Sequence, residues 1–81
     1  NAEDINLYPN PVESNLMVSV PNNGFMTIYN ISGKQMYSQN IPSGISVLNT
    51  DNYAKGVYIF KYTTEKGTTT LRFLKINQVE S

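Results

Sequence analysis

The sequence predicts an all-β fold, a compact seven-stranded antiparallel β-sandwich. The 81 residues are enough for one domain. Seven short runs of apolar and β-branched residues are separated by turn residues about every 8–12 positions, which is typical of such sandwiches. Only residues 50–55 have helical character, and a single turn is too short to form a helix on its own.

The first two predicted strands lie before residue 21. Residues 5–8 form a short strand that ends at two prolines, which fix φ and remove two N–H donors, so residues 9–11 form a rigid bend or a break at a strand edge. Residues 16–20 follow, with alternate apolar side chains on one face. Residues 21–24, Pro-Asn-Asn-Gly, favour a tight hairpin because Asn and Gly tolerate positive φ.

The next two strands are joined by a turn at residues 30–33. Residues 25–29 form the first of them, with Met26 and Ile28 predicted to face the core. Residues 34–39 form the second, and their short, hydrophilic character predicts an edge strand.

The second half is organised around residues 56–62, Gly-Val-Tyr-Ile-Phe-Lys-Tyr. Both faces of this run are largely apolar, which is typical of a strand inside a sheet. Before it, residues 41–44 form a loop and residues 45–48 a brief strand. Residues 50–55 form a turn that we expect to place Tyr53 in the core.

The last hairpin pairs residues 57–63 with residues 68–76 through a turn at residues 65–67. Apolar side chains occur at both parities of the final strand, so the sequence does not decide which of its faces points toward the core. We expect residues 1–4 to be a linker remnant and residues 77–81 a flexible tail.

Charge and composition exclude several classes of function. Six basic and six acidic residues cancel, so the chain has no basic field for nucleic acid or an anionic membrane. Histidine and cysteine are absent, which removes the commonest general base and the usual metal ligands. No apolar run approaches the roughly 20 residues that span a bilayer. If the protein is exported, we expect the inner-membrane signal to lie on a longer precursor.

The sequence shows no arrangement of residues suited to catalysis. Its serines have no histidine as a base, and its six carboxylates form no acid–base pair on rigid elements. Residues 49–52 are the nearest candidate for calcium, but they lack a bidentate glutamate, so a role in turn formation and capping is favoured. We therefore expect no enzyme activity, no metal site and no cofactor.

Tyrosine is over-used, with six copies. An exposed row of rings can stack on sugars. Parity places Tyr53, Tyr58 and Tyr62 inward and leaves Tyr37, and less clearly Tyr29, to face outward. A carbohydrate-binding or adhesive β-sandwich of a secreted enzyme is therefore the alternative function.

Four sequence blocks occur in order along the chain. They are Leu-Tyr-Pro-Asn-Pro, Ile-Tyr-Asn-Ile-Ser-Gly-Lys, Gly-Val-Tyr-Ile-Phe-Lys-Tyr and Arg-Phe-Leu-Lys-Ile. This order resembles the type A C-terminal sorting domain of cargo of the type IX (Por) secretion system in Bacteroidetes, and the resemblance covers residues 5–76. The residues that match the family's motifs are Pro9, Asn10, Pro11, Gly33, Lys34, Gly56, Tyr58, Lys75 and Ile76.

The resemblance implies an immunoglobulin-like sandwich that folds in the periplasm and acts as a non-catalytic address label. A larger cargo protein would be covalently linked on its N-terminal side. The outer-membrane translocon and a shuttle protein would recognise the domain, and a sortase-like cysteine protease would usually remove it. The cargo would then be at the cell surface or secreted. Such chains usually stop near Ile76, whereas five residues follow it here.

Exposed strand edges are the predicted contact points. A partner strand can pair with an open sheet edge through main-chain hydrogen bonds. We expect residues 34–39 or the final strand, around residues 72–76, to present such groups. An open edge also permits an edge-to-edge or swapped dimer.

Overall fold

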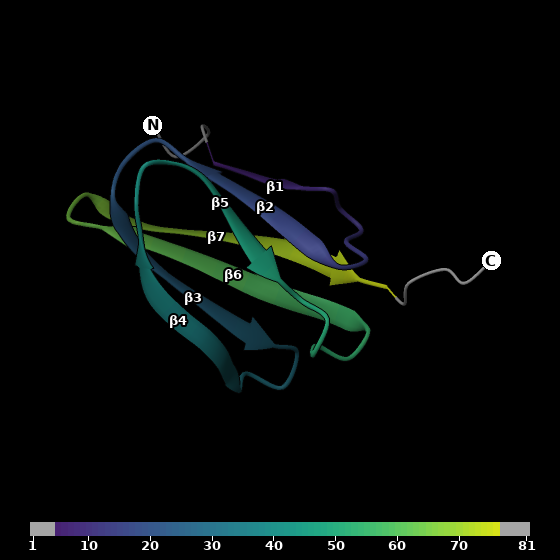
Figure 1. Ribbon diagram of the computed structural model, residues 1–81. Coiled ribbons are helices and arrows are strands. Elements are labelled where there is room, and N and C mark those ends of the chain that lie inside the picture. The colour runs from purple at the N-terminus through teal and green to yellow at the C-terminus, as the bar shows by residue number, and fades with distance from the viewer. Residues whose placement is uncertain (1–4, 77–81) are drawn as a thin grey trace.

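The computed structural model describes residues 5–76, which form seven antiparallel strands in two sheets. One sheet has the order β1-β2-β5 and the other β4-β3-β6-β7, and the two lie face to face as a sandwich (Figure 1). The predicted all-β class and strand number are confirmed. The expected linker remnant and flexible tail lie outside the described residues. The strands are β1 (Asn6–Tyr8), β2 (Asn15–Val20), β3 (Gly24–Asn30), β4 (Gln35–Ile41), β5 (Gly44–Asn49), β6 (Gly56–Thr64) and β7 (Gly67–Lys75).

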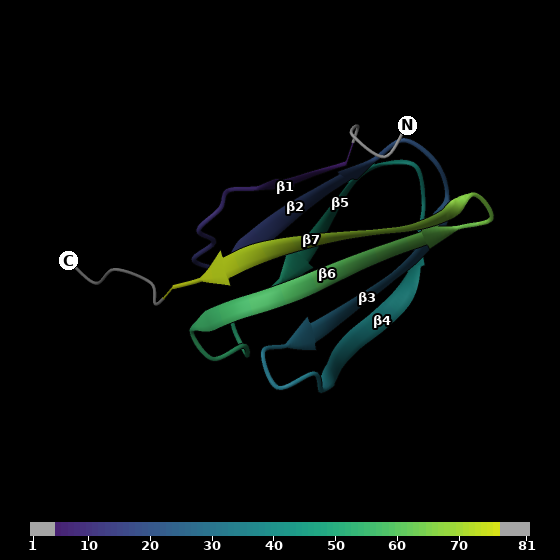
Figure 2. The same ribbon diagram turned by 180° about the vertical axis from the view of Figure 1, so that it is seen from behind.

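Strand β6 lies between β3 and β7, so the prediction of an interior strand is confirmed (Figure 2). Its Tyr58, Phe60 and Tyr62 side chains are buried between the sheets. The opposite face of β6 looks outward, and Val57 is 37% exposed. The apolar residues on both faces of β6 therefore indicate correctly that it lies inside the sheet, although only one of the two faces is buried.

The core lies between the inner faces of the two sheets. Alternate residues of β2 point inward, as do Met26 and Ile28 of β3, which confirms the predicted core face of that strand. In β7 the inward set includes Phe73 and Lys75, whereas Leu74 faces outward. The buried apolar residues are Ile5, Val12, Leu16, Val18, Val20, Met26, Ile28, Ile41, Tyr58, Phe60, Tyr62 and Phe73.

The predicted hairpin at residues 21–24 is wrong. Strand β2 pairs with β1 and β5, whereas β3 pairs with β4 and β6, so the chain crosses from one sheet to the other at this point. Both strands carry a strongly apolar face, and these faces bury each other across the sandwich rather than side by side in one sheet. Turn residues alone cannot distinguish the two outcomes, because each needs the chain to reverse.

Gly24 begins β3 where its backbone approaches the end of β6. A Cβ atom at this position would lie 2.7 Å from the Thr63 carbonyl oxygen and 2.7 Å from Cε1 of Tyr62. Gly24→Ala is therefore expected to lower the free energy of unfolding by about 1–3 kcal/mol, the usual effect of overpacking. Urea denaturation measures the loss. The neighbouring Asn22→Ala removes an exposed side chain and should change stability by about 0.5 kcal/mol or less. An unchanged midpoint for Gly24→Ala would contradict the close approach.

The edges of the sheets are formed by β1 and β5 in one sheet and by β4 and β7 in the other. The predicted edge position of the strand around residues 34–39 is confirmed in β4. Strand β1 begins beside the end of β2, whereas β7 ends beside the start of β6, toward the other end of the sandwich (Figure 1). Residues 5–76 contain no helix with the length and hydropathy needed to cross a membrane.

Candidate recognition surface

The Pro9-Asn10-Pro11 bend lies against the outer edge of β7. The Asn10 side chain accepts a hydrogen bond through Oδ1 from the Leu74 N–H at 3.0 Å, and its Nδ2 donates to the Arg72 carbonyl at 3.5 Å. One side-chain amide thus pairs with two main-chain groups as a neighbouring strand would. The bend joins residues that are more than 60 positions apart in the sequence.

Val12 extends this cover along β7. Its N–H donates to the Leu74 carbonyl at 2.8 Å, and its carbonyl accepts from the Ile76 N–H at 3.0 Å, which forms a short parallel bridge. The Val12 side chain is fully buried. The expectation that residues 72–76 present an open edge is therefore wrong around Leu74. Asn10 and Val12 occupy both main-chain groups of Leu74, and they also bond to the Arg72 carbonyl and the Ile76 N–H.

Lys75 is buried in spite of its charge and is 5% exposed. Its Nζ donates a hydrogen bond to the Glu13 carbonyl, which follows the bend. A buried ammonium group is tolerated where such a partner replaces water. Lys75 therefore holds the bend against β7 and does not present its charge on the surface.

Gly56 and Tyr58 support the same region from inside. Gly56 faces Lys75 in the β6–β7 register and has φ 146°, which favours glycine. The Tyr58 hydroxyl donates to the Ala54 carbonyl at 2.6 Å, and its ring stacks on Phe73 with centroids 5.5 Å apart. Both residues shape the fold, and Tyr58 is too buried for a partner to contact directly.

Gly33 and Lys34 lie in the turn between β3 and β4. The Asn30 side-chain oxygen accepts hydrogen bonds from the N–H groups of Ser32 and Lys34, both at 2.9 Å. Gly33 has φ 89°, a conformation that a side chain would strain. Because Asn30 pairs with Tyr58, this turn lies at the same end of the sandwich as the start of β6.

The nine motif residues therefore gather at one end of the molecule, which we call the motif end (Figure 1). The bend and the β3–β4 turn form two exposed corners of it. Gly56, Tyr58 and Lys75 lie between or beneath them and position the surface. The exposed motif residues are Pro9, Asn10, Pro11, Gly33 and Lys34, and Ile76 is half-buried.

A hydrogen-bonded loop cluster ties the motif end together. Ser14 donates through Oγ to the Asp51 carboxylate at 2.7 Å, and the Asn49 side-chain oxygen accepts from the Asp51 N–H at 3.0 Å. Hydrogen bonds from Ser14 and then Asn49 lower the pKa of Asp51 below its usual value of 3.8. The candidate calcium segment at residues 49–52 thus serves in turn formation. Among the described residues no group of three or more potential ligands could hold a metal ion.

The two tyrosines predicted to face outward separate onto opposite faces of their sheet. Tyr37 packs against the core, so its predicted orientation is wrong, because β4 and β3 pair with Ile28 opposite Tyr37. Tyr29 faces outward, and the Lys61 Nζ lies over its ring, 5.3 Å from the ring centroid. The expected inward position of Tyr53 is confirmed, and burial raises the pKa of its hydroxyl. The two rings therefore do not form one sugar-stacking platform.

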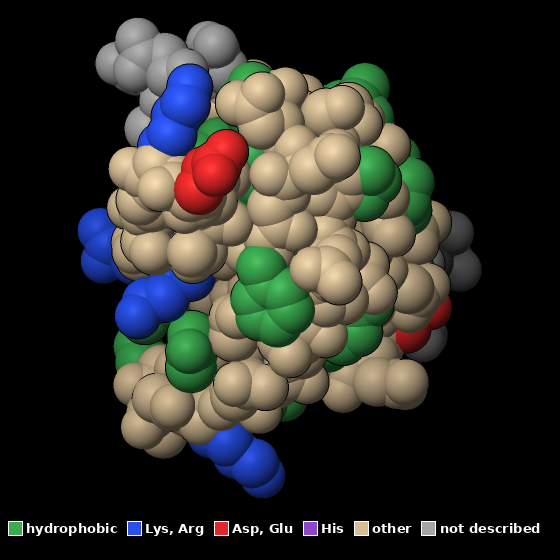
Figure 3. Space-filling model, turned by 90° about the vertical axis from the view of Figure 1, so that its left-hand side faces the viewer, with side chains coloured by type: hydrophobic (Ala, Val, Ile, Leu, Met, Phe, Trp, Pro, Cys, Tyr) green, Lys and Arg blue, Asp and Glu red, His purple; other side chains and the backbone are tan. Residues whose placement is uncertain are grey.

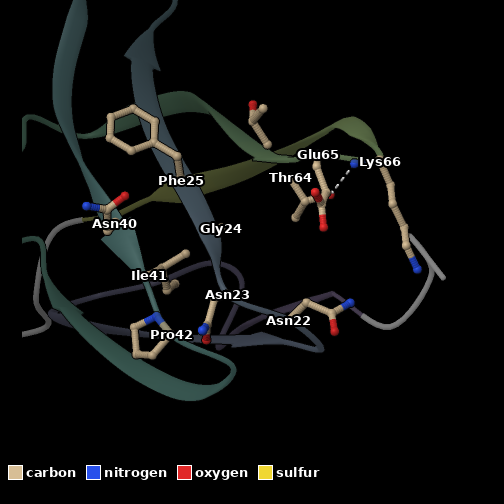
Figure 4. Close-up of a pocket in the computed structure, with 11 residues that line it drawn as sticks. Asn22, Asn23, Gly24, Phe25, Asn40, Ile41, Pro42, Thr64, Glu65 and Lys66 are labelled. Carbon is tan, nitrogen blue, oxygen red and sulfur yellow. Dashed lines mark hydrogen bonds between the residues drawn. The ribbon is translucent and has the colours of Figure 1, made fainter.

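A surface cavity of about 870 Å³ lies at the opposite end (Figure 3). Its walls come from the β2–β3 crossing, the end of β4 and the β6–β7 turn, with Phe25 and Asn40 on one side and Glu65 and Lys66 on the other (Figure 4). Ile41 closes its base as the last residue of β4 rather than as part of the predicted loop. None of the nine motif residues lines this cavity.

Three residues of the motif end are not apparent from sequence reasoning. Val12 is an isolated apolar residue in a polar loop, Asn30 is one of several turn residues, and Ser14 bonds only to a distant loop. An apolar residue directly after the second proline is the one local sign that the bend folds back onto the core.

These features define a small β-sandwich module whose distinctive surface is built at one end from the bend, the β3–β4 turn and the last strand. Comparison with protein families gives a match over residues 6–77 to the secretion system C-terminal sorting domain. The chain belongs to this family, the C-terminal sorting domains of type IX secretion. The family implies attachment to a cargo, interaction with the secretion machinery and export to the cell surface or secretion. A comparison with curated proteins found no match.

Proposed function

We propose that the chain is a non-catalytic C-terminal signal of type A that directs a larger cargo of a Bacteroidetes bacterium through the outer-membrane type IX translocon. In this proposal the domain folds in the periplasm, where a shuttle protein and the translocon bind the motif end. A sortase-like cysteine protease then removes the domain at the cell surface. The cargo is covalently linked on the N-terminal side.

The single observation that carries this proposal is that residues from all four sequence blocks meet at the motif end. Asn10 and Leu74 are joined by a hydrogen bond across 64 positions of sequence, and Asn30 lies opposite Tyr58 on the neighbouring strands β3 and β6. Packing alone would require apolar residues in these positions, yet the bend and the β3–β4 turn are exposed. An exposed, rigidly held surface suits recognition by another protein.

The direction of β1 supports the same proposal. Strand β1 begins beside the end of β2, away from the end of the sandwich where β7 stops (Figure 1). In this proposal the cargo joins the domain before β1, on the side away from the motif end, which leaves the motif end accessible to the machinery while the cargo remains attached.

A fusion experiment tests the sorting function. Residues 1–81 are attached to the C-terminus of a fluorescent protein that carries an inner-membrane export signal, and the fusion is expressed in a type IX-competent bacterium and in its translocon-null mutant. We expect fluorescence at the surface or in the medium of the competent strain only. Periplasmic retention in both strains would overturn the proposal.

Two exposed lysines provide a matched pair for locating the recognition surface. Lys34 lies in the turn at the motif end and Lys66 in the turn at the opposite end, and both side chains are exposed. Lys34→Ala should reduce export of the fusion, whereas Lys66→Ala should leave it unchanged. The reverse result would place the recognition surface at the β6–β7 turn and contradict recognition at the motif end.

A further inference from the structure

Strand β5 has one unpaired side. It is the outer strand of its sheet, and no strand within residues 5–76 pairs with it on the side away from β2. The Thr50 N–H donates to the Ser14 carbonyl at 2.8 Å and continues the β2–β5 register by one residue. Because main-chain groups alternate along an antiparallel strand, those of Ile45, Val47 and Asn49 point away from β2.

Two of these three residues carry exposed apolar side chains. Ile45 is 65% exposed and Val47 is 61% exposed on the outer face of the sheet. Val47 lies opposite Met17, and Met17 lies opposite Tyr8, so an outward row of three apolar residues crosses the sheet and ends at the open edge.

This sheet has no charged residue to discourage pairing. Strands β1, β2 and β5 contain no Asp, Glu, Lys or Arg. Natural edges are commonly protected by lysine, proline, bulges or a covering segment. The edge of β7 is covered at Asn10 and Val12, and the pairing of β4 is interrupted between Ile28 and Tyr29. Strand β5 has neither device.

We propose that β5 is the interface of a homodimer, in which two copies pair antiparallel about a two-fold axis at Val47. Val47 then lies opposite the partner's Val47, and Ile45 lies opposite the partner's Asn49. All outward main-chain groups of these three residues are then satisfied. The β1-β2-β5 sheet of one copy joins that of the other to form a single six-stranded sheet. The apolar row ends at Val47, so its best complement is a second copy of itself.

Charge and size set the character of this dimer. Neutral strands meet without repulsion, and the chain itself has no net charge. An edge of about six residues buries less surface than the roughly 800 Å² per partner of a standard stable interface. The dimer is therefore concentration-dependent. It is independent of the sorting function, because its formation needs no component of the secretion machinery.

Cysteine cross-linking tests the two-fold axis, since the natural chain has no cysteine. In this arrangement the two Val47 Cα atoms are about 5.5 Å apart, within the range of a disulfide. The two Ile45 Cα atoms are about 14 Å apart along the strand. Mild oxidation should cross-link Val47→Cys about tenfold faster than Ile45→Cys or more, although the natural side chains are similarly exposed, at 61% and 65%. Equal rates would overturn the proposed register.

Sedimentation equilibrium of the 81-residue chain over a wide concentration range tests the edge. Val47→Lys places two like charges together and should raise the dissociation constant at least about tenfold. Met36→Lys on the edge of β4 is the control and should leave self-association unchanged. The reverse pattern would move the dimer to β4 and overturn the proposal. A monomer at every concentration would also overturn it and leave β5 free for another polypeptide.

Discussion

Phe73→Ala is expected to lower the free energy of unfolding by about 3–5 kcal/mol, as is usual for the loss of a buried phenylalanine. The Phe73 side chain is 2% exposed and stacks on Tyr58, so its removal leaves a cavity between the two sheets. A domain of this length has a total stability of roughly 4–12 kcal/mol. The variant should therefore be marginally folded, and chemical denaturation measures the loss.

Leu74→Ala is the matched control for this prediction. Leu74 is the next residue of β7, but its side chain faces outward and is 38% exposed. Its removal should cost about 1 kcal/mol or less. If Leu74→Ala cost as much as Phe73→Ala, the inner and outer faces of the final strand would be assigned the wrong way round.

Asn10→Ala is expected to reduce export of the fluorescent fusion strongly while the domain stays folded. The substitution removes the acceptor of the Leu74 N–H and uncovers the edge of β7 at the point where Asn10 bonds. The loss of one such hydrogen bond costs about 1 kcal/mol, too little to unfold the sandwich. Residues 9–11 would lose their own contact with the final strand, although Val12 stays bound to it, and the exposed surface that we propose the translocon binds would no longer be held in place.

Asn10→Asp separates this positioning role from the identity of the side chain. Aspartate keeps an oxygen for the Leu74 N–H at 3.0 Å and loses only the donor of the longer contact to Arg72. Its export should exceed that of Asn10→Ala, and its stability should stay close to that of the natural chain. Equal and complete loss of export by both variants, with both folded, would show that the amide itself is read and that bend positioning is not the cause.

Local patterns in the sequence predict most of the individual elements. The alternation of apolar residues identifies the interior strand β6 and the core positions Met26 and Ile28, because burial of one face depends on a period of two. Glycine and asparagine mark the turn at residues 30–33, where Gly33 adopts positive φ. The order of the sequence blocks also identifies the family, to which the chain is shown to belong over residues 6–77.

The pairing of elements is decided only by the tertiary structure. The segment at residues 21–24 could close a hairpin or cross between sheets, and the choice depends on where the apolar faces of β2 and β3 are buried. Tyr37 turns inward because its register with β3 places it opposite Ile28. Neither fact is visible in the segments themselves, since strand partners are not specified by local propensity.

The motif end shows the same division most clearly. The sequence by itself determined which residues carry the family's blocks and that the strands between them are short and regular. Only the folded chain shows that Asn10 and Val12 lie against β7, that Lys75 is buried, and that the bend and the β3–β4 turn form the exposed corners. The physical reason is that these contacts join positions about 60 residues apart, and such contacts exist only once both sheets have packed on their common core.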